Sequence, residues 1–211
     1  MRFSESSLRE LLLQRLRPLR EAPHDGQPPR GDFDLNPQWK PGLGARNLRP
    51  AAVLVPIVTR KAELHVLFTE RAQDMPSHPG QVSFPGGRMQ ADDADAVATA
   101  LRETEEETGI APEFIEPLGL LDSYETGSGY AISPVVAFVR EGFAITRDTR
   151  EVADIFEAPF DFLMDPDNHE RHAREWQGTL RHFYAMPYDG HYIWGATAGM
   201  IVNLYERILK P

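Results

Sequence analysis

Cysteine is absent from the 211 residues of the sequence. No disulfide framework can therefore hold the chain together, and cysteine usage says nothing about the redox compartment. The sequence also has no apolar run long enough to cross a bilayer, and no secretory apolar segment near its start. We therefore expect a cytoplasmic protein that makes no use of a membrane.

Positive charge is scarce as well. Lys and Arg number 22 against 32 Asp and Glu, which gives a net charge of −10. This balance disfavours binding to nucleic acid. An anionic substrate would need a local positive site, and a bound metal ion would supply one. The length fits one domain with a sizeable core, and the content of 41% hydrophobic and 26% charged residues is ordinary for a soluble globular protein.

The first part of the chain differs in character from the rest. Residues 4–20 predict an amphipathic helix, and residues 21–50 are rich in Pro, Gly and polar residues, which is typical of a linker or a wrapped arm. The arginines of the helix would suit a transit peptide, but Glu5 and Glu10 speak against one. We favour a helix that packs on the domain or on the partner of a homodimer. Its apolar side would contain Leu8, Leu11, Leu12, Leu16 and Leu19.

These features divide the chain into an N-terminal helix and Pro-rich arm, residues 1–49, and a main domain, residues 50–211. In the main domain we expect strands interleaved with a few helices. Residues 180–188 and 192–193 predict a hairpin that turns at Asp189 and Gly190. Such alternation favours the α/β class, with a mixed sheet covered on both faces. The other expected strands span residues 51–59, 64–69, 117–124, 132–139 and 152–157, and the closing helix spans 196–209.

A cluster of carboxylates carries the strongest functional signal. Residues 102–110 read Arg-Glu-Thr-Glu-Glu-Glu-Thr-Gly-Ile, and the turn Phe84–Gly87 lies just upstream. We expect a helix over 95–108, ended by Gly109. Advancing ~100° per residue, Glu103, Glu106 and Glu107 share one side of it. The opposite, core-facing stripe would contain Val97, Leu101, Thr104 and Thr108.

Local physics argues against such a cluster unless a cation binds it. Acidic residues near the C-terminus of a helix oppose its dipole, and like charges four residues apart repel. A divalent cation would reverse both effects, and ligands that are all hard oxygens favour Mg²⁺ or Mn²⁺. The plain alternative is a solvated acidic face without a ligand.

The carboxylate stretch resembles the Nudix box, G-x5-E-x7-R-E-U-x-E-E-x-G-U, in which U is apolar. The box positions in its second half are occupied by Arg102, Glu103, Glu106, Glu107, Gly109 and Ile110. In the first half, the Glu position falls on Ala94 and the Gly position on Arg88, one residue after Gly87. One residue is therefore inserted in the loop. The candidates to replace the missing Glu are Asp92, Asp93 and Asp95.

The resemblance implies a Nudix α/β/α sandwich with a mixed sheet, and a hydrolase that splits a diphosphate bond. It implies that Glu103, Glu106 and Glu107 bind the metal, with Glu103 also orienting or deprotonating water. Arg102 would hold a box carboxylate in place, and the turn glycines Gly86 and Gly87 would let the backbone approach the helix.

A second resemblance narrows the substrate. The segment 67–87 is similar to the motif that precedes the box in coenzyme A pyrophosphatases, although Phe68 replaces a Leu and Pro76 a second Arg. The resemblance implies hydrolysis of coenzyme A or its thioesters to 3′,5′-ADP and 4′-phosphopantetheine or its acyl form, with Arg71 and His78 as substrate contacts. The residues that match the motif are Leu67, Thr69, Arg71, Ala72, Gly80 and Phe84–Gly87.

Two other functions stay open. One is hydrolysis of another dinucleotide, such as NADH or ADP-ribose. The other is a Nudix-like binding module without catalysis, because a fold alone does not establish activity. Glu151, just before an expected strand, is a candidate for a further base or metal ligand.

Overall fold

The computed structural model describes residues 3–20, 29–39, 47–176 and 178–210, and in them a nine-stranded mixed sheet accompanies a three-stranded one. The large sheet consists of β1 (Arg30–Gly31), β2 (Arg49–Arg60), β3 (Glu63–Arg71), β4 (Val82–Ser83), β5 (Gly86–Arg88), β6 (Ile115–Leu120), β7 (Tyr124–Glu125), β8 (Tyr130–Val139) and β9 (Val152–Pro159). Its main path runs β1-β7-β8-β2-β3-β4, and β5, β6 and β9 pair with β2, β8 and β3. The central pair, β2 and β8, is parallel, whereas β2 and β3 are antiparallel.

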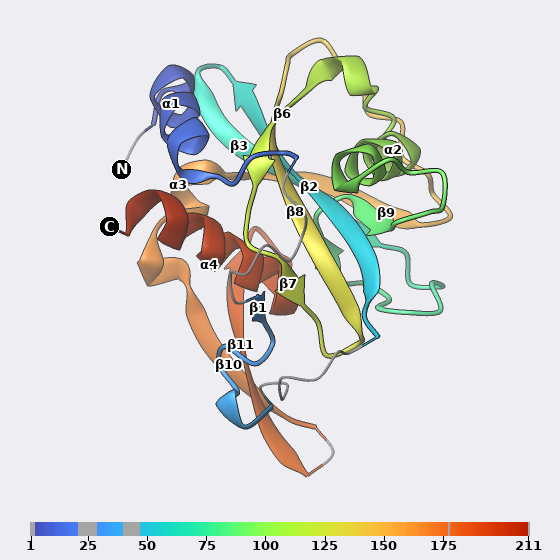
Figure 1. Ribbon diagram of the computed structural model, residues 1–211, viewed down its shortest axis with the longest axis vertical. Helices are drawn as coiled ribbons and strands as arrows, with labels where there is room; N and C mark the ends of the chain where they lie inside the picture. The colour runs from blue at the N-terminus through green and yellow to red at the C-terminus, as the bar shows by residue number, and fades with distance from the viewer. Residues whose placement is uncertain (1–2, 21–28, 40–46, 177, 211) are drawn as a thin grey trace.

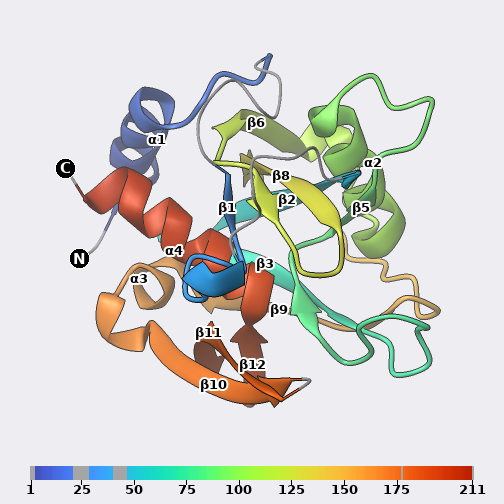
Figure 2. The same cartoon turned by 60° about the horizontal axis from the view of Figure 1, so that its bottom comes forward.

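Helices cover both faces of this sheet (Figures 1 and 2). Along β2 the side chains alternate between the faces, as the pleat requires. Val53, Val55 and Ile57 pack in the core that contains α1 (Glu5–Arg15) and α4 (Gly195–Leu209). Ala52 and Leu54 pack in the core beneath α2 (Ala96–Thr108). The expected α/β/α sandwich is therefore confirmed.

The N-terminal helix is shorter than the sequence pattern predicts. Leu8 and Leu12 are fully buried against the α4 layer, as expected, but α1 ends at Arg15. Pro18 disfavours helical backbone at Arg17. The amide of Arg17 instead donates to the carbonyl of Leu120 at 3.0 Å. The prediction that Leu19 shares the apolar side is wrong, because Leu19 packs in the other core, beside α2. Much of the expected arm, 21–28 and 40–46, lies outside the described residues.

The second half of the chain adds the small antiparallel sheet, β10 (Glu170–Trp176), β11 (Thr179–Tyr188) and β12 (His191–Trp194). The hairpin between β11 and β12 is confirmed, and both turn residues, Asp189 (φ 47°) and Gly190 (φ 82°), have the positive φ that a type I′ turn needs. The short α3 (Phe160–Leu163) links β9 to this sheet. Among the described helices, none has the length and apolar character of a membrane span.

Candidate active site

The helix that holds the carboxylates, α2, has well-defined ends. The side chain of Asp95 caps its N-terminus by accepting from the amide of Ala98 at 2.9 Å. Gly109 ends it in the left-handed region, with φ 75°. The last carbonyls, which lack partners inside a helix, accept from the following loop: Thr108 from the amide of Thr146 (2.8 Å) and Glu107 from the amide of Asp148 (3.1 Å). This fixes the 146–151 loop beside the carboxylates.

Arg102 lies at the centre of a network of carboxylates. Its Nη1 donates to Glu103 Oε1 at 2.8 Å and to Glu106 Oε2 at 3.2 Å. On its other side, Nε and Nη2 donate to the two oxygens of Asp93 at 3.0 and 2.9 Å. The pKa of Asp93 is consequently held well below its usual range, chiefly by Arg102. Arg102 thus bridges Asp93 to two of the box carboxylates.

The same contacts distinguish the three candidates for the missing box Glu. Asp95 is used as the helix cap, and Asp92 is exposed. Asp93 alone of the three bonds Arg102, and it also accepts from the amide of Gln90 at 2.8 Å and the hydroxyl of Thr99 at 3.0 Å. An acidic side chain from the lengthened loop therefore reaches the arginine despite the inserted residue.

Glu107 is almost completely buried, with 5% of its surface exposed. This corrects the prediction that it lies opposite the core-facing stripe. Glu107 and the fully buried Thr104 are only ~60° apart around the helix, so Glu107 lies at the edge of the packed face. Its Oε2 accepts from the amide of Gly86 at 3.4 Å. Burial raises the pKa of Glu107 to about 8, although the charge of Arg71 acts in the opposite direction.

Glu103 lies against the glycine turn. A Cβ on Gly87 would come within 2.5 Å of its carboxyl carbon, so a larger residue there would displace the Glu103 carboxylate. The Glu103 side chain is 15% exposed, and burial raises its pKa even though Arg102 lowers it. The two turn glycines therefore have separate roles: Gly86 donates to one carboxylate, and Gly87 makes room for another.

These carboxylates line a cavity of about 230 Å³ together with the 146–151 loop. The loop contributes Asp148, Arg150 and Glu151. Arg150 is 85% exposed at its side chain, and its Nη2 donates to Asp148 Oδ2 at 2.6 Å. Of these three residues, only Glu151 was predicted from the sequence. The only sequence feature that marks Asp148 and Arg150 is the run of charged residues before β9. This run has no periodicity, so it does not distinguish residues that line a cavity from residues of a solvated loop.

Arg71 and His78, which the resemblance implies as substrate contacts, are not among the residues that line this cavity. Arg71 ends β3, and its positive charge lowers the pKa of Glu107, so it lies close enough to the carboxylates to act on them. Its Nε donates to the carbonyl of Ser77 at 3.4 Å. His78 is exposed in the loop that follows, with a positive φ of 56°.

The donor chemistry of the cavity fits a hard divalent cation. Its acidic groups offer only carboxylate oxygens, and a carboxylate as buried as Glu107, with a single long hydrogen bond, lacks compensation for its charge. In the described residues, however, no three acidic or histidine side chains are already arranged to hold an ion. Arg102 bonds Oε1 of Glu103 and Oε2 of Glu106, so a metal ion would be held through the other oxygen of each carboxylate.

Comparison with known proteins identifies the family. A family profile described as NUDIX domain matches residues 48–181. The Nudix hydrolase NudL of Enterobacter sp. (strain 638) is 36% identical over 166 residues, which cover 78% of this chain and 86% of that protein. NudL of Citrobacter koseri is 35% identical over 162 residues, covering 77% and 84% of the two chains.

Among solved structures, a MutT/nudix family protein from Enterococcus faecalis matches 99% of this chain and 76% of its own. The TM-score is 0.50 at 15% identity, a likeness that concerns the fold alone. The profile covers more than half of the chain, and the NudL relatives share over a third of their aligned residues with it. The chain therefore belongs to the Nudix family and is a hydrolase of nucleoside diphosphate-linked compounds.

Proposed function

We propose that this hydrolase splits the diphosphate bond of coenzyme A or its thioesters in a reaction that depends on Mg²⁺ or Mn²⁺. Water adds to one phosphorus and the bridging P–O bond breaks, which yields 3′,5′-ADP and 4′-phosphopantetheine or its acyl form. The observation that carries the hydrolytic part is the convergence of Glu103, Glu106 and Glu107 on one cavity beside the glycine turn. The motif of residues 67–87 supports coenzyme A.

In this proposal the side chains around the cavity divide the work. Glu103, Glu106 and Glu107 would hold the metal, which when bound would neutralise phosphate charge and acidify water. Glu103 orients the water and accepts its proton, and Glu151, in the same cavity, is a second candidate for that proton. Arg102 and Asp93 keep the carboxylates in position. Gly86 and Gly87 bring the backbone close enough to the helix for this arrangement.

Substrate contacts complete the proposal. The electrostatic effect of Arg71 on Glu107 supports a contact between Arg71 and the diphosphate itself. His78, exposed in the loop after β3, is available to a more distant part of the substrate. Pro76 leaves this loop with one arginine fewer than the motif, so we expect other cations to contribute to binding.

Side-by-side measurement of kcat/KM for coenzyme A, dephospho-coenzyme A, NADH and ADP-ribose, with product analysis, tests the substrate. We expect coenzyme A to be hydrolysed best, and dephospho-coenzyme A less well. A tenfold or greater advantage for NADH or ADP-ribose would overturn the coenzyme A proposal and leave hydrolysis of another dinucleotide. No turnover of any diphosphate in Mg²⁺ or Mn²⁺ would favour a binding module without catalysis.

A further inference from the structure

One face of the small sheet carries a group of aromatic rings, His172 on β10, Phe183 on β11, and Tyr192 and Trp194 on β12. The strand register puts His172 opposite Phe183, and Trp194 opposite Ala185, two residues further along β11. Residues opposite each other, and residues two apart on a strand, share a face. The ring centroids accordingly lie 5.1 Å apart for Phe183 and Trp194, 6.1 Å for His172 and Phe183, and 6.2 Å for Tyr192 and Trp194.

This aromatic face is not part of the packed interior. None of its four rings belongs to either of the two buried clusters on the large sheet. Tyr192 is 39% exposed, and Phe183 and Trp194 are half-buried. The opposite face of the same sheet behaves differently, because Met186 and Ile193 are fully buried against the α4 layer. The aromatic face is therefore the solvent-facing side of a sheet whose other side is anchored.

The rings are held in place. The hydroxyl of Tyr192 and Nδ1 of His172 are 2.6 Å apart, and Nε2 of the same histidine lies 2.6 Å from a carboxylate oxygen of Glu170. A planar group that stacks on Tyr192 would therefore meet a surface with little rotamer entropy left to lose. Rigid, partly exposed aromatic rings suit a flat, aromatic ligand.

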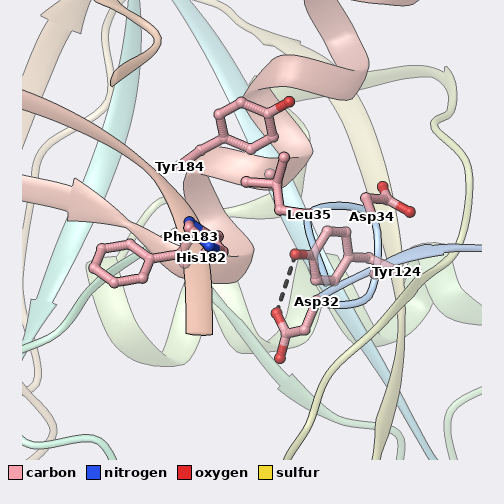
Figure 3. A pocket seen from close by; sticks show the side chains of 10 residues that line it. Asp32, Asp34, Leu35, Tyr124, His182, Phe183 and Tyr184 are labelled. Carbon is pink, nitrogen blue, oxygen red and sulfur yellow. Dashed lines mark hydrogen bonds between the residues drawn. The ribbon is translucent and has the colours of Figure 1, made fainter. Parts of the chain in front are cut away.

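Two arginines stand on the same face. Arg174 and Arg181 are directly opposed across β10 and β11, an arrangement in which like charges destabilise a sheet. Arg181 is held by Asp32, which also accepts from the amide of Gly127 at 2.7 Å. The hydroxyl of Tyr124 donates to the same carboxylate at 3.1 Å (Figure 3). Arg174 is exposed. Because Asp32 already pairs with Arg181, Arg174 is the arginine of the two that is exposed to an incoming anion.

The small sheet also contacts the large sheet close to the glycine turn. β12 contacts β4, and the hydroxyl of Thr197, three residues after Trp194, donates to the carbonyl of Val82 at 3.1 Å. Val82 begins the strand that leads directly into the glycine turn at Gly86. A ligand that extends from the cavity along this strand would approach the small sheet.

From rings, charges and position together, we propose that the aromatic face binds the nucleotide base of the substrate. The base stacks on the rings of Tyr192 and Trp194, and the exposed Arg174 receives the phosphate on its ribose. The proposal rests on the proposed function, since it assigns this site to the adenine end of the coenzyme A class. The neighbouring cavity between Asp32 and Tyr184, at about 20 Å³, has room for little more than a water molecule.

Binding of 3′,5′-ADP to the full-length protein tests the proposal, measured by calorimetry in EDTA so that no metal bridges the phosphates. Tyr192→Ala should raise Kd about fivefold or more, the range that loss of one base-stacking ring produces. Tyr192→Phe keeps the ring and should bind nearly as the wild type does. Arg174→Ala should raise Kd and reduce its dependence on salt. The matched control is Arg171→Ala, on the opposite face of β10, which should leave Kd unchanged.

An unchanged Kd for both Tyr192→Ala and Arg174→Ala would overturn the proposal. So would a Tyr192→Ala protein that changes from dimer to monomer in sedimentation while it keeps its affinity for 3′,5′-ADP, because the face would then join two copies. Turnover separates this proposal from the previous one. If Tyr192→Ala hydrolyses coenzyme A with the wild-type KM, the base site is wrong but coenzyme A remains the proposed substrate. If 3′,5′-ADP binding depends on Tyr192 but coenzyme A is not hydrolysed, the base site stands and the proposed substrate is wrong.

Discussion

Arg102 and Asp93 face each other through two hydrogen bonds, from Nε to Oδ1 at 3.0 Å and from Nη2 to Oδ2 at 2.9 Å. Asp93 lies in the loop before α2 and Arg102 in the middle of the helix, so the pair fixes the loop to the helix. The remaining nitrogen of the guanidinium, Nη1, bonds Glu103 and Glu106. The position of both carboxylates therefore depends on Asp93, which does not line the cavity.

Asp93→Ala should lower activity without unfolding the protein. Residues that orient the ligands of a metal typically account for about 10–100-fold in metal affinity or activity. We expect a loss in that range, seen mainly as a higher concentration of Mg²⁺ needed for half-maximal rate. The control is Asp92→Ala, at an exposed position of the same loop. Equal metal dependence in the two variants would contradict the role given to Asp93.

Arg150→Ala should raise KM and change kcat little. Arg150 is the one basic side chain among the residues that line the cavity, and Asp148 holds it there. Hydrogen bonds to charged groups contribute ~1.5–3 kcal/mol, so loss of a phosphate contact predicts about a tenfold or larger rise in KM. Arg147→Ala, on the same loop but outside the cavity lining, serves as the control. A fall in kcat with KM unchanged would instead assign Arg150 to the chemical step.

Without metal, stability should fall as the pH rises from about 4.5 to about 8. The pKa of Glu107 is about 8 in the folded protein against a usual 4.5, so in this window the folded state binds the additional proton. Stability falls with pH wherever the folded state binds more protons than the unfolded state, by ~1.4 kcal/mol for each unit that separates the two pKa values. Urea unfolding in EDTA at pH 5.5 and pH 8 measures the loss. Glu107→Gln should flatten the difference, and a slope that survives this substitution would assign it to other groups.

Mg²⁺ or Mn²⁺ should raise the melting temperature. A ligand that binds only the folded state stabilises it by about 2.7 kcal/mol at 100 times its Kd. Glu103→Gln should weaken this response, because one ligand oxygen becomes an amide. Calorimetric scans over a metal titration test both statements. A melting temperature that does not change with metal concentration over that range would contradict the proposed metal site.

The fold and the carboxylate cluster could be predicted because their signals are local. The cap at Asp95, the glycine at 109 and the positive-φ turn at Asp189 and Gly190 each specify backbone shape within a few residues. β10 escaped prediction because Glu170–Trp176 is mostly charged and has no apolar alternation, and its pairing with β11 decides its conformation. The burial of Glu107 depends on the glycine turn, whose contact with the helix is long-range and leaves no periodic pattern.

The cavity wall shows the same limit. Whether Asp148 and Arg150 face solvent or the carboxylates depends on where the 146–151 loop docks, and two backbone bonds to the end of α2 determine that. Sequence spacing gives no measure of such docking. The loop could be recognised as charged, but its side chains could not be assigned to the cavity.

The most direct test of the account is the turnover of Glu107→Gln under saturating Mg²⁺, with the best diphosphate substrate of the panel. Loss of a carboxylate from an electrostatic catalytic site predicts a fall in kcat of at least about 10²-fold. The melting temperature in EDTA should be retained. A neutral amide avoids the cost of burying a carboxylate charge, which is the effect that raises the pKa of Glu107. A folded Glu107→Gln protein with near wild-type kcat would show that the carboxylate cluster of α2 is not the catalytic site.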